Sequence, residues 1–181
     1  MPAAVGRRLL SIQEDGARRP SSRAELLHLL RECSLSCGRN RVESLLGRRD
    51  YSSAELSEKL RTDGYPTSVV EELVERAVSC GLVDDARFGA SFARSKVASG
   101  WGRLKIEREL ERRGISPDAI DGWPEEYVSS DAERERALSL ARRRRLTGKN
   151  DYEKTVRFLC GRGFSLSLSA EVARDVLSED E

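Results

Sequence analysis

The chain has 181 residues, of which 38% are hydrophobic, 6% aromatic and 35% charged. So small an apolar content excludes one thick sandwich or barrel, and it favours several small helical units that each bury a narrow apolar stripe. No stretch approaches the roughly 20 apolar residues of a membrane helix. No early apolar run fits a signal peptide, and the four cysteines form no C-x-x-C pair. We therefore expect a cytoplasmic protein with reduced thiols.

The formal net charge of +1 conceals a strong asymmetry along the chain. Residues 50–85 contain nine acids and three bases, residues 92–113 contain seven bases and three acids, and residues 136–149 contain six bases and no acid. This distribution predicts a polyanionic partner for the second half, with the acidic region either solvated or facing a basic protein surface. The alternative is that the charge runs are simply solvated helix faces.

Residues 1–38 show no regular pattern. Residues 24–30 are compatible with a short helix, but Gly6, Gly16 and Pro20 interrupt the segment. We expect a loosely ordered amino-terminal arm.

Helix starts and helix ends alternate from about residue 40 onward. Capping boxes predict helix starts at Asn40-x-x-Glu43, Ser52-x-x-Glu55, Ser68-x-x-Glu71 and Ser130-x-x-Glu133. Glycines that precede an apolar residue predict left-handed helix ends at Gly64, Gly114 and Gly163. These glycines stand 50 and 49 residues apart, and a leucine lies four residues before each of them. The spacing predicts three tandem repeats.

Each repeat is predicted to contain three short helices. In the first repeat they cover about residues 40–49, 53–63 and 68–79. In the second, Asp84 or Asp85 caps the first helix, the next covers residues 103–113, and Gly122-Trp123-Pro124 cuts short the one that opens at Ser116-Pro117. The sequence thus predicts an all-α, elongated tandem array of three three-helix repeats. Its parts are an arm at 1–38, repeats at 39–84, 85–129 and 130–178, and an acidic tail at 179–181.

Three segments of the chain form a signature in a fixed order. They are GLVDDARF at 81–88 with FARS at 92–95, GRLKIEREL at 102–110 running into RGI at 113–115, and LCGRGF at 159–164. The signature resembles the RecX family. The resemblance implies a repeat array that lies in the groove of a filament of RecA on single-stranded DNA. It further implies that the protein inhibits the recombinase, ATPase and coprotease activities of RecA in DNA repair and the SOS response.

The helix predicted at residues 103–113 carries a directional basic stripe. Ile106 and Leu110 define its buried side, and Lys105, Arg108 and Arg112 fall on one flank. Arg108 and Arg112 are like charges one turn apart, which disfavours the helix unless DNA phosphate or an acidic face of RecA answers them. The alternative is that both extend into water or pair with acids of a neighbouring repeat.

A second basic cluster is the run of four arginines at residues 142–145, followed by Lys149. On a continuous helix this run points in all directions, and we expect Arg143, Arg144 and Lys149 to face outward while Arg142 or Arg145 lies over the core. The candidate contacts to DNA or to the RecA filament are Arg94, Lys96, Arg103, Lys105, Arg108, Arg112, Arg143, Arg144 and Lys149.

The two tryptophans have competing interpretations. Trp101 lies between two glycines, where its ring is free either to stack on an unpaired base or to fill the joint between two helices. Trp123 occupies an apolar position of the repeat and is expected in the core.

No combination of residues predicts catalysis or a cofactor. Helix capping explains Asp84 and Asp85 better than acid–base or metal chemistry does. His28, Cys33 and Cys37 match no common zinc spacing. We expect a protein that is not an enzyme, and a monomer because heptads are absent. The alternatives to a RecA regulator are a helical protein that binds single-stranded or duplex DNA without RecA, and a helical scaffold with no nucleic-acid role.

Overall fold

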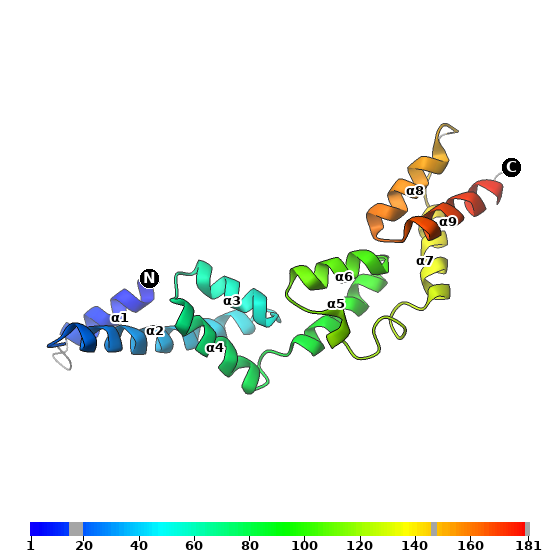
Figure 1. Ribbon diagram of the computed structural model, residues 1–181. Coiled ribbons are helices and arrows are strands. Elements are labelled where there is room, and N and C mark those ends of the chain that lie inside the picture. Colours follow the sequence, from blue (N-terminus) through cyan, green and yellow to red (C-terminus); the bar gives the residue numbers. More distant parts are fainter. Residues whose placement is uncertain (15–19, 146–147, 180–181) are drawn as a thin grey trace. The chain divides into compact units, whose positions relative to one another are not determined.

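The computed structural model describes residues 1–14, 20–145 and 148–179, and every regular element in these ranges is helical. The predicted all-α class is therefore confirmed. The chain divides into two compact units, residues 1–85 and 86–181. Figure 1 shows their helices in sequence colours. The predicted repeat boundaries at residues 39, 85 and 130 stay a prediction.

The described residues of the first unit form four helices, which are α1 (Ala3–Glu14), α2 (Arg23–Leu46), α3 (Ser53–Thr62) and α4 (Thr67–Ser79). Helix α1 packs against α2, and both α2 and α3 pack against α4. Leu56, Leu60 and Val70 are fully buried at the centre of this unit.

The expectation of a loosely ordered arm at residues 1–38 was wrong for the described residues of that segment. They form α1 and most of α2. Ser22 caps α2 by accepting a hydrogen bond from the Glu25 N–H, and Leu29 and Cys33 bury one face of the helix. Asn40 lies inside this 24-residue helix and starts none. Gly38 is needed because a Cβ there would meet the Leu73 side chain at 2.3 Å. The glycine thus marks a close approach between helices, and the partner helix could not be located from local sequence.

The second unit begins one residue into α5 (Asp85–Ala98). Its further described elements are α6 (Arg103–Arg112), the 3₁₀ turn η1 (Pro117–Ala119), α7 (Ser130–Arg142), α8 (Asp151–Arg162) and α9 (Leu166–Glu179). One apolar cluster joins α5, α6 and η1 through Ala93, Ile106 and Ile120. A second joins α7, α8 and α9 around Phe164 and Val172. The third helix of the middle repeat is a single turn, as the Gly122-Trp123-Pro124 segment predicts.

The three predicted glycine helix ends are confirmed. Gly64, Gly114 and Gly163 have φ angles of 90°, 74° and 95°, which is the left-handed conformation that glycine adopts without steric cost. In each case the N–H of the following apolar residue donates to the carbonyl of the leucine four residues before the glycine. The donors are Tyr65, Ile115 and Phe164, at 3.1, 3.0 and 3.2 Å from the oxygens of Leu60, Leu110 and Leu159.

The predicted helix starts were less accurate than the ends. Ser52 caps α3 as expected, accepting from the Glu55 N–H. Helix α4 begins at Thr67 behind Pro66 and has no side-chain cap, so the box at Ser68 was wrong. The cap of α7 is Ser129, one residue before the predicted Ser130.

At the starts of α3 and α6, a backbone N–H donates to a carboxylate about thirty residues further along the chain. The Ser53 N–H at the start of α3 donates to Asp85, 32 residues later, at 2.7 Å. The Arg103 N–H at the start of α6 donates to Glu133, 30 residues later, also at 2.7 Å. Asp85 therefore adds a second acceptor at the start of α3, beside its cap Ser52. Glu133 accepts from the start of α6 instead of completing a capping box in α7. An acid at a helix start satisfies a free N–H and complements the helix dipole.

Candidate nucleic-acid interface

A cluster of aromatic rings and lysines lies where α5 meets α6. The half-buried Trp101 ring meets Phe92 edge to face, with ring centroids 6.4 Å apart. The ammonium groups of Lys105 and Lys96 lie 4.3 and 5.0 Å from the centre of the Trp101 ring. Both distances are typical of cation–π attraction. Trp101 thus packs at the joint between the helices and positions two of the candidate lysines, while base stacking on it stays a prediction.

The start of α6 is joined to the end of α8 by backbone hydrogen bonds within the second unit. The Gly102 N–H donates to the Arg162 carbonyl at 2.9 Å, and the Leu104 N–H donates to the Gly163 carbonyl at 3.1 Å. A Cβ at Gly102 would lie 2.4 Å from the Gly163 carbonyl carbon. Only glycine permits this approach, which aligns unsatisfied N–H groups of one helix with unsatisfied carbonyls of another.

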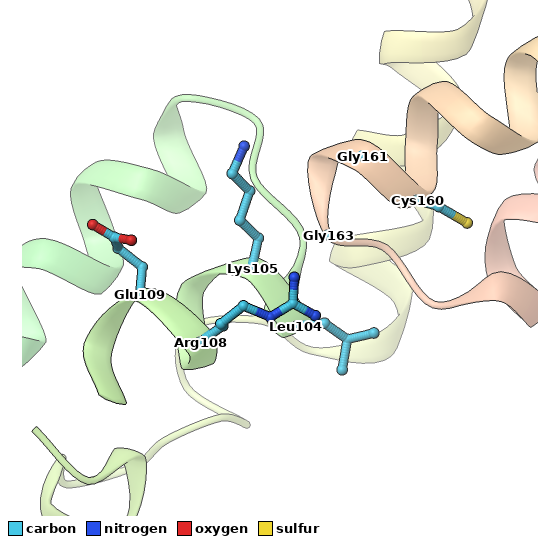
Figure 2. A pocket seen from close by; sticks show the side chains of 7 residues that line it. All are labelled: Leu104, Lys105, Arg108, Glu109, Cys160, Gly161 and Gly163. Atoms are coloured by element: carbon cyan, nitrogen blue, oxygen red, sulfur yellow. The ribbon is translucent and has the colours of Figure 1, made fainter. Parts of the chain in front are cut away.

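A hollow of about 250 Å³ lies at this junction (Figure 2). Its walls are four residues of α6 and three from the end of α8, namely Leu104, Lys105, Arg108, Glu109, Cys160, Gly161 and Gly163. Figure 2 shows the Arg108 side chain extending from α6 toward the end of α8, while Glu109 points to the opposite side. We call this feature the α6–α8 hollow.

The predicted stripe on α6 is only partly available for an external anion. Arg108 is exposed, and no residue in the described part of the chain forms a hydrogen bond or ion pair with it. Arg112 instead holds Glu109, with its Nε 2.9 Å from the carboxylate, and Arg113 contacts the same group at 3.1 Å. The hydrogen bond from Arg112 and then that from Arg113 lower the pKa of Glu109 to about 2. An acid three residues before Arg112 therefore pairs with it inside the helix, and contact of Arg112 with DNA or RecA stays a prediction.

Other candidate residues of the middle repeat have local partners. The Nε of Arg103 donates to Glu107 at 2.6 Å, and the indole N–H of Trp123 donates to the same carboxylate at 3.2 Å. The guanidinium of Arg94 lies 5.2 Å from the centre of the Tyr127 ring. Trp123 is only half-buried and packs at the edge of its cluster, so its expected place in the core is met in part.

The arrangement of the second basic cluster differs from the prediction. Arg144 is half-buried, with its guanidinium 4.7 Å from the centre of the Phe158 ring and its Nη1 donating to the Lys154 carbonyl. Arg142 and Arg145 are exposed. The prediction assumed a continuous helix, but α7 ends at Arg142, and the backbone beyond it no longer follows helical spacing. Arg143 and Lys149 are exposed, as expected.

Sequence reasoning identified Lys105 and Arg108 but missed the α8 wall of the hollow. Gly163 predicted a helix end, but its sequence context did not predict that α6 approaches it closely. Likewise, no sequence signal singled out Arg136 on α7, whose Nε and Nη2 are buried without a hydrogen-bond partner among the described residues. Burial lowers the pKa of this guanidinium.

A metal-binding cluster and a membrane-spanning helix are both absent from the described ranges. No three His, Cys, Asp or Glu side chains there are grouped so as to hold a metal ion. No helix there combines the length and apolar character needed to cross a bilayer.

The helices and their repeated glycine ends place the protein among those built from three-helix repeats. The chain belongs to the RecX family. Residues 39–76 match the family model of the first RecX three-helix domain, and residues 84–122 match that of the second.

Relatives described as regulatory protein RecX match most of the chain. The one from Legionella pneumophila (strain Corby) is 31% identical over 142 residues, covering 74% of this chain and 91% of the relative. The one from Chromohalobacter salexigens is 37% identical over 122 residues, covering 66% of this chain and 80% of the relative. These matches support a regulatory role.

Solved structures share the fold. The crystal structure of RecX from Lactobacillus salivarius is 20% identical with a TM-score of 0.65, and it covers 79% of this chain and 96% of that one. A second crystal structure of regulatory protein RecX has a TM-score of 0.69 at 20% identity, covering 90% of this chain and 80% of that one.

Proposed function

We propose that this protein is a non-enzymatic, cytoplasmic regulator of RecA. It binds as a monomer to the filament of RecA on single-stranded DNA and inhibits the recombinase, ATPase and coprotease activities of RecA in DNA repair and the SOS response. Membership of the RecX family provides the context for this proposal. The observation that carries it is the α6–α8 hollow, which is lined by the exposed Arg108 and by the half-buried Lys105, whose ammonium lies over the Trp101 ring.

The chemistry of the α6–α8 hollow suits a phosphodiester. The planar guanidinium of Arg108 forms no ion pair with any described residue, so its N–H groups can donate to phosphate oxygens. The Lys105 ammonium is held over the Trp101 ring. The acid in the wall, Glu109, has its charge balanced by two arginines. Releasing counterions from DNA at such a surface would make binding strongly dependent on salt.

The acidic stretch at residues 50–85 favours a filament over bare DNA. Helices α3 and α4 expose the carboxylates of Glu58, Glu71 and Glu75, which DNA phosphate would repel and a basic protein surface would attract. The second candidate, a helical protein that binds DNA without RecA, is favoured by the basic residues of the second unit.

The test is the rate of DNA-dependent ATP hydrolysis by the cognate RecA, with substoichiometric amounts of this protein. We expect inhibition by the wild type and at least a tenfold higher concentration requirement for Lys105→Glu/Arg108→Glu. Tenfold corresponds to about 1.4 kcal/mol, within the range for losing a phosphate-facing charge pair. The matched control is Arg61→Glu/Arg76→Glu, which makes the same charge change at exposed positions of the first unit.

Failure of the folded wild type to inhibit at any ratio would overturn the regulator proposal. If the wild type then still bound single-stranded DNA in a salt-dependent way, and the double variant did not, the second candidate would replace it.

A further inference from the structure

A second hollow, of about 480 Å³, lies on helices α1 and α2 of the first unit. Arg8 and Ile12 contribute from α1, and His28, Leu29, Leu35 and Arg39 are among the contributors from α2. Apart from Arg39, these residues precede the segments that match the RecX family models. We call it the α1–α2 hollow.

The positive charge in the α1–α2 hollow is only partly neutralised. Arg31 pairs with Glu72 at 2.5 Å, and His28 lies 3.6 Å from Glu32. Arg8 and Arg39 are exposed, and they form no hydrogen bond or ion pair with any residue of the described ranges. Two guanidinium groups in one depression repel each other unless an anion lies between them. The hollow therefore has two positive charges available for a ligand.

The floor of this hollow is apolar and uncharged. Leu29 and Leu35 are 5% and 8% exposed, and Ile12 is half-buried beside them. Burial raises the pKa of the neighbouring Cys33 thiol, which leaves it neutral near pH 7. An apolar floor below cationic side chains can receive a molecule that carries negative charge on one side and apolar surface on the other.

We propose that the α1–α2 hollow binds the phosphodiester backbone of a nucleic acid through Arg8 and Arg39, as a site separate from the α6–α8 hollow. The planar guanidinium fork matches phosphate oxygens in pairs. The floor accommodates the sugar or an unstacked base, and the volume falls within the usual range for small-ligand pockets. The proposal shares the nucleic-acid part of the proposed function but does not depend on inhibition of RecA.

The test is salt-dependent binding of the full-length protein, without RecA, to a fluorescently labelled oligothymidylate. Losing two phosphate contacts should make the slope of log affinity against log salt shallower by about 1.4, since each contact to a single strand contributes about 0.7. We expect this change in Arg8→Glu/Arg39→Glu and also in the milder Arg8→Gln/Arg39→Gln. The control Arg7→Glu/Arg23→Glu changes the same charge on the same two helices outside the hollow, and it should keep the wild-type slope.

Circular dichroism would establish that each variant keeps its helices. A wild-type slope in both folded Arg8/Arg39 variants would overturn the proposal, and so would an equal loss in the control. Because the readout contains no RecA, failure here leaves the ATPase test of the proposed function untouched. Loss of inhibition in the ATPase assay likewise leaves this binding test unaffected.

Discussion

Glu109 determines which arginines of the basic stripe are available to an external anion. It lies in the wall of the α6–α8 hollow, yet Arg112 and Arg113 hold its carboxylate. Arg108 is therefore the arginine of the stripe that projects without an intrahelical acid. The pairing of Arg112 with an acid three residues earlier could have been predicted from helical spacing. The end of α8 beside Arg108 could not, because it comes from more than fifty residues further along the chain.

The lowered pKa of Glu109 predicts how this cluster contributes to stability as pH changes. Its folded-state pKa is about 2 against an ordinary 4.5, so its stabilisation is fully present above pH 4.5 and is lost as the pH falls toward 2. Glu109→Gln should lower the free energy of unfolding by about 1 kcal/mol near pH 6, a modest value because Arg112 is 66% exposed. Urea unfolding at pH 6 and pH 3 should show a smaller difference between the two proteins at pH 3. An equal or larger difference at pH 3 would contradict this account.

At the scale of helices, ends were easier to predict than starts. A glycine followed by an apolar residue is a local signal, and the three glycines predicted from it as repeat positions, Gly64, Gly114 and Gly163, all end helices. The caps of α3 and α6 are partly nonlocal, because Asp85 and Glu133 supply carboxylates from about thirty residues away. Helix α2 was missed for a related reason, since its buried face is completed by α1 and α4.

The junction of α6 with α8 predicts opposite effects for two glycine substitutions. Gly102→Ala places a Cβ 2.4 Å from the Gly163 backbone and should lower the free energy of unfolding by at least about 2 kcal/mol. Gly161→Ala meets nothing within 4 Å inside α8 and should raise it by about 0.5–1 kcal/mol. Thermal or urea unfolding of the two variants would measure both effects. Equal stability of Gly102→Ala and the wild type would show that the two backbones are not this close.

At the scale of the whole molecule, the acidic window and the two basic windows fall in different units. The acidic window at residues 50–85 falls in the first unit, and both basic windows fall in the second. The sequence therefore predicted a basic surface in the second unit, but not which of its basic residues are available to an anion. That selection depends on where α7 ends, on the acids beside each arginine and on the packing of Trp101.

The central claim is that the α6–α8 hollow lies against DNA in the RecA filament, and two cysteines allow a direct test. Cys160 lies in the wall of the hollow with its thiol hydrogen-bonded to the Ser169 hydroxyl, whereas Cys80 ends α4 in the first unit. Both residues are exposed, and neither forms a disulfide. The measurement is the rate of maleimide labelling at each cysteine, resolved by mass spectrometry, with and without RecA filaments on single-stranded DNA. We predict labelling of Cys160 slowed at least fivefold by the filament, with Cys80 much less affected. An unchanged rate at Cys160, under conditions where binding is complete, would contradict the account.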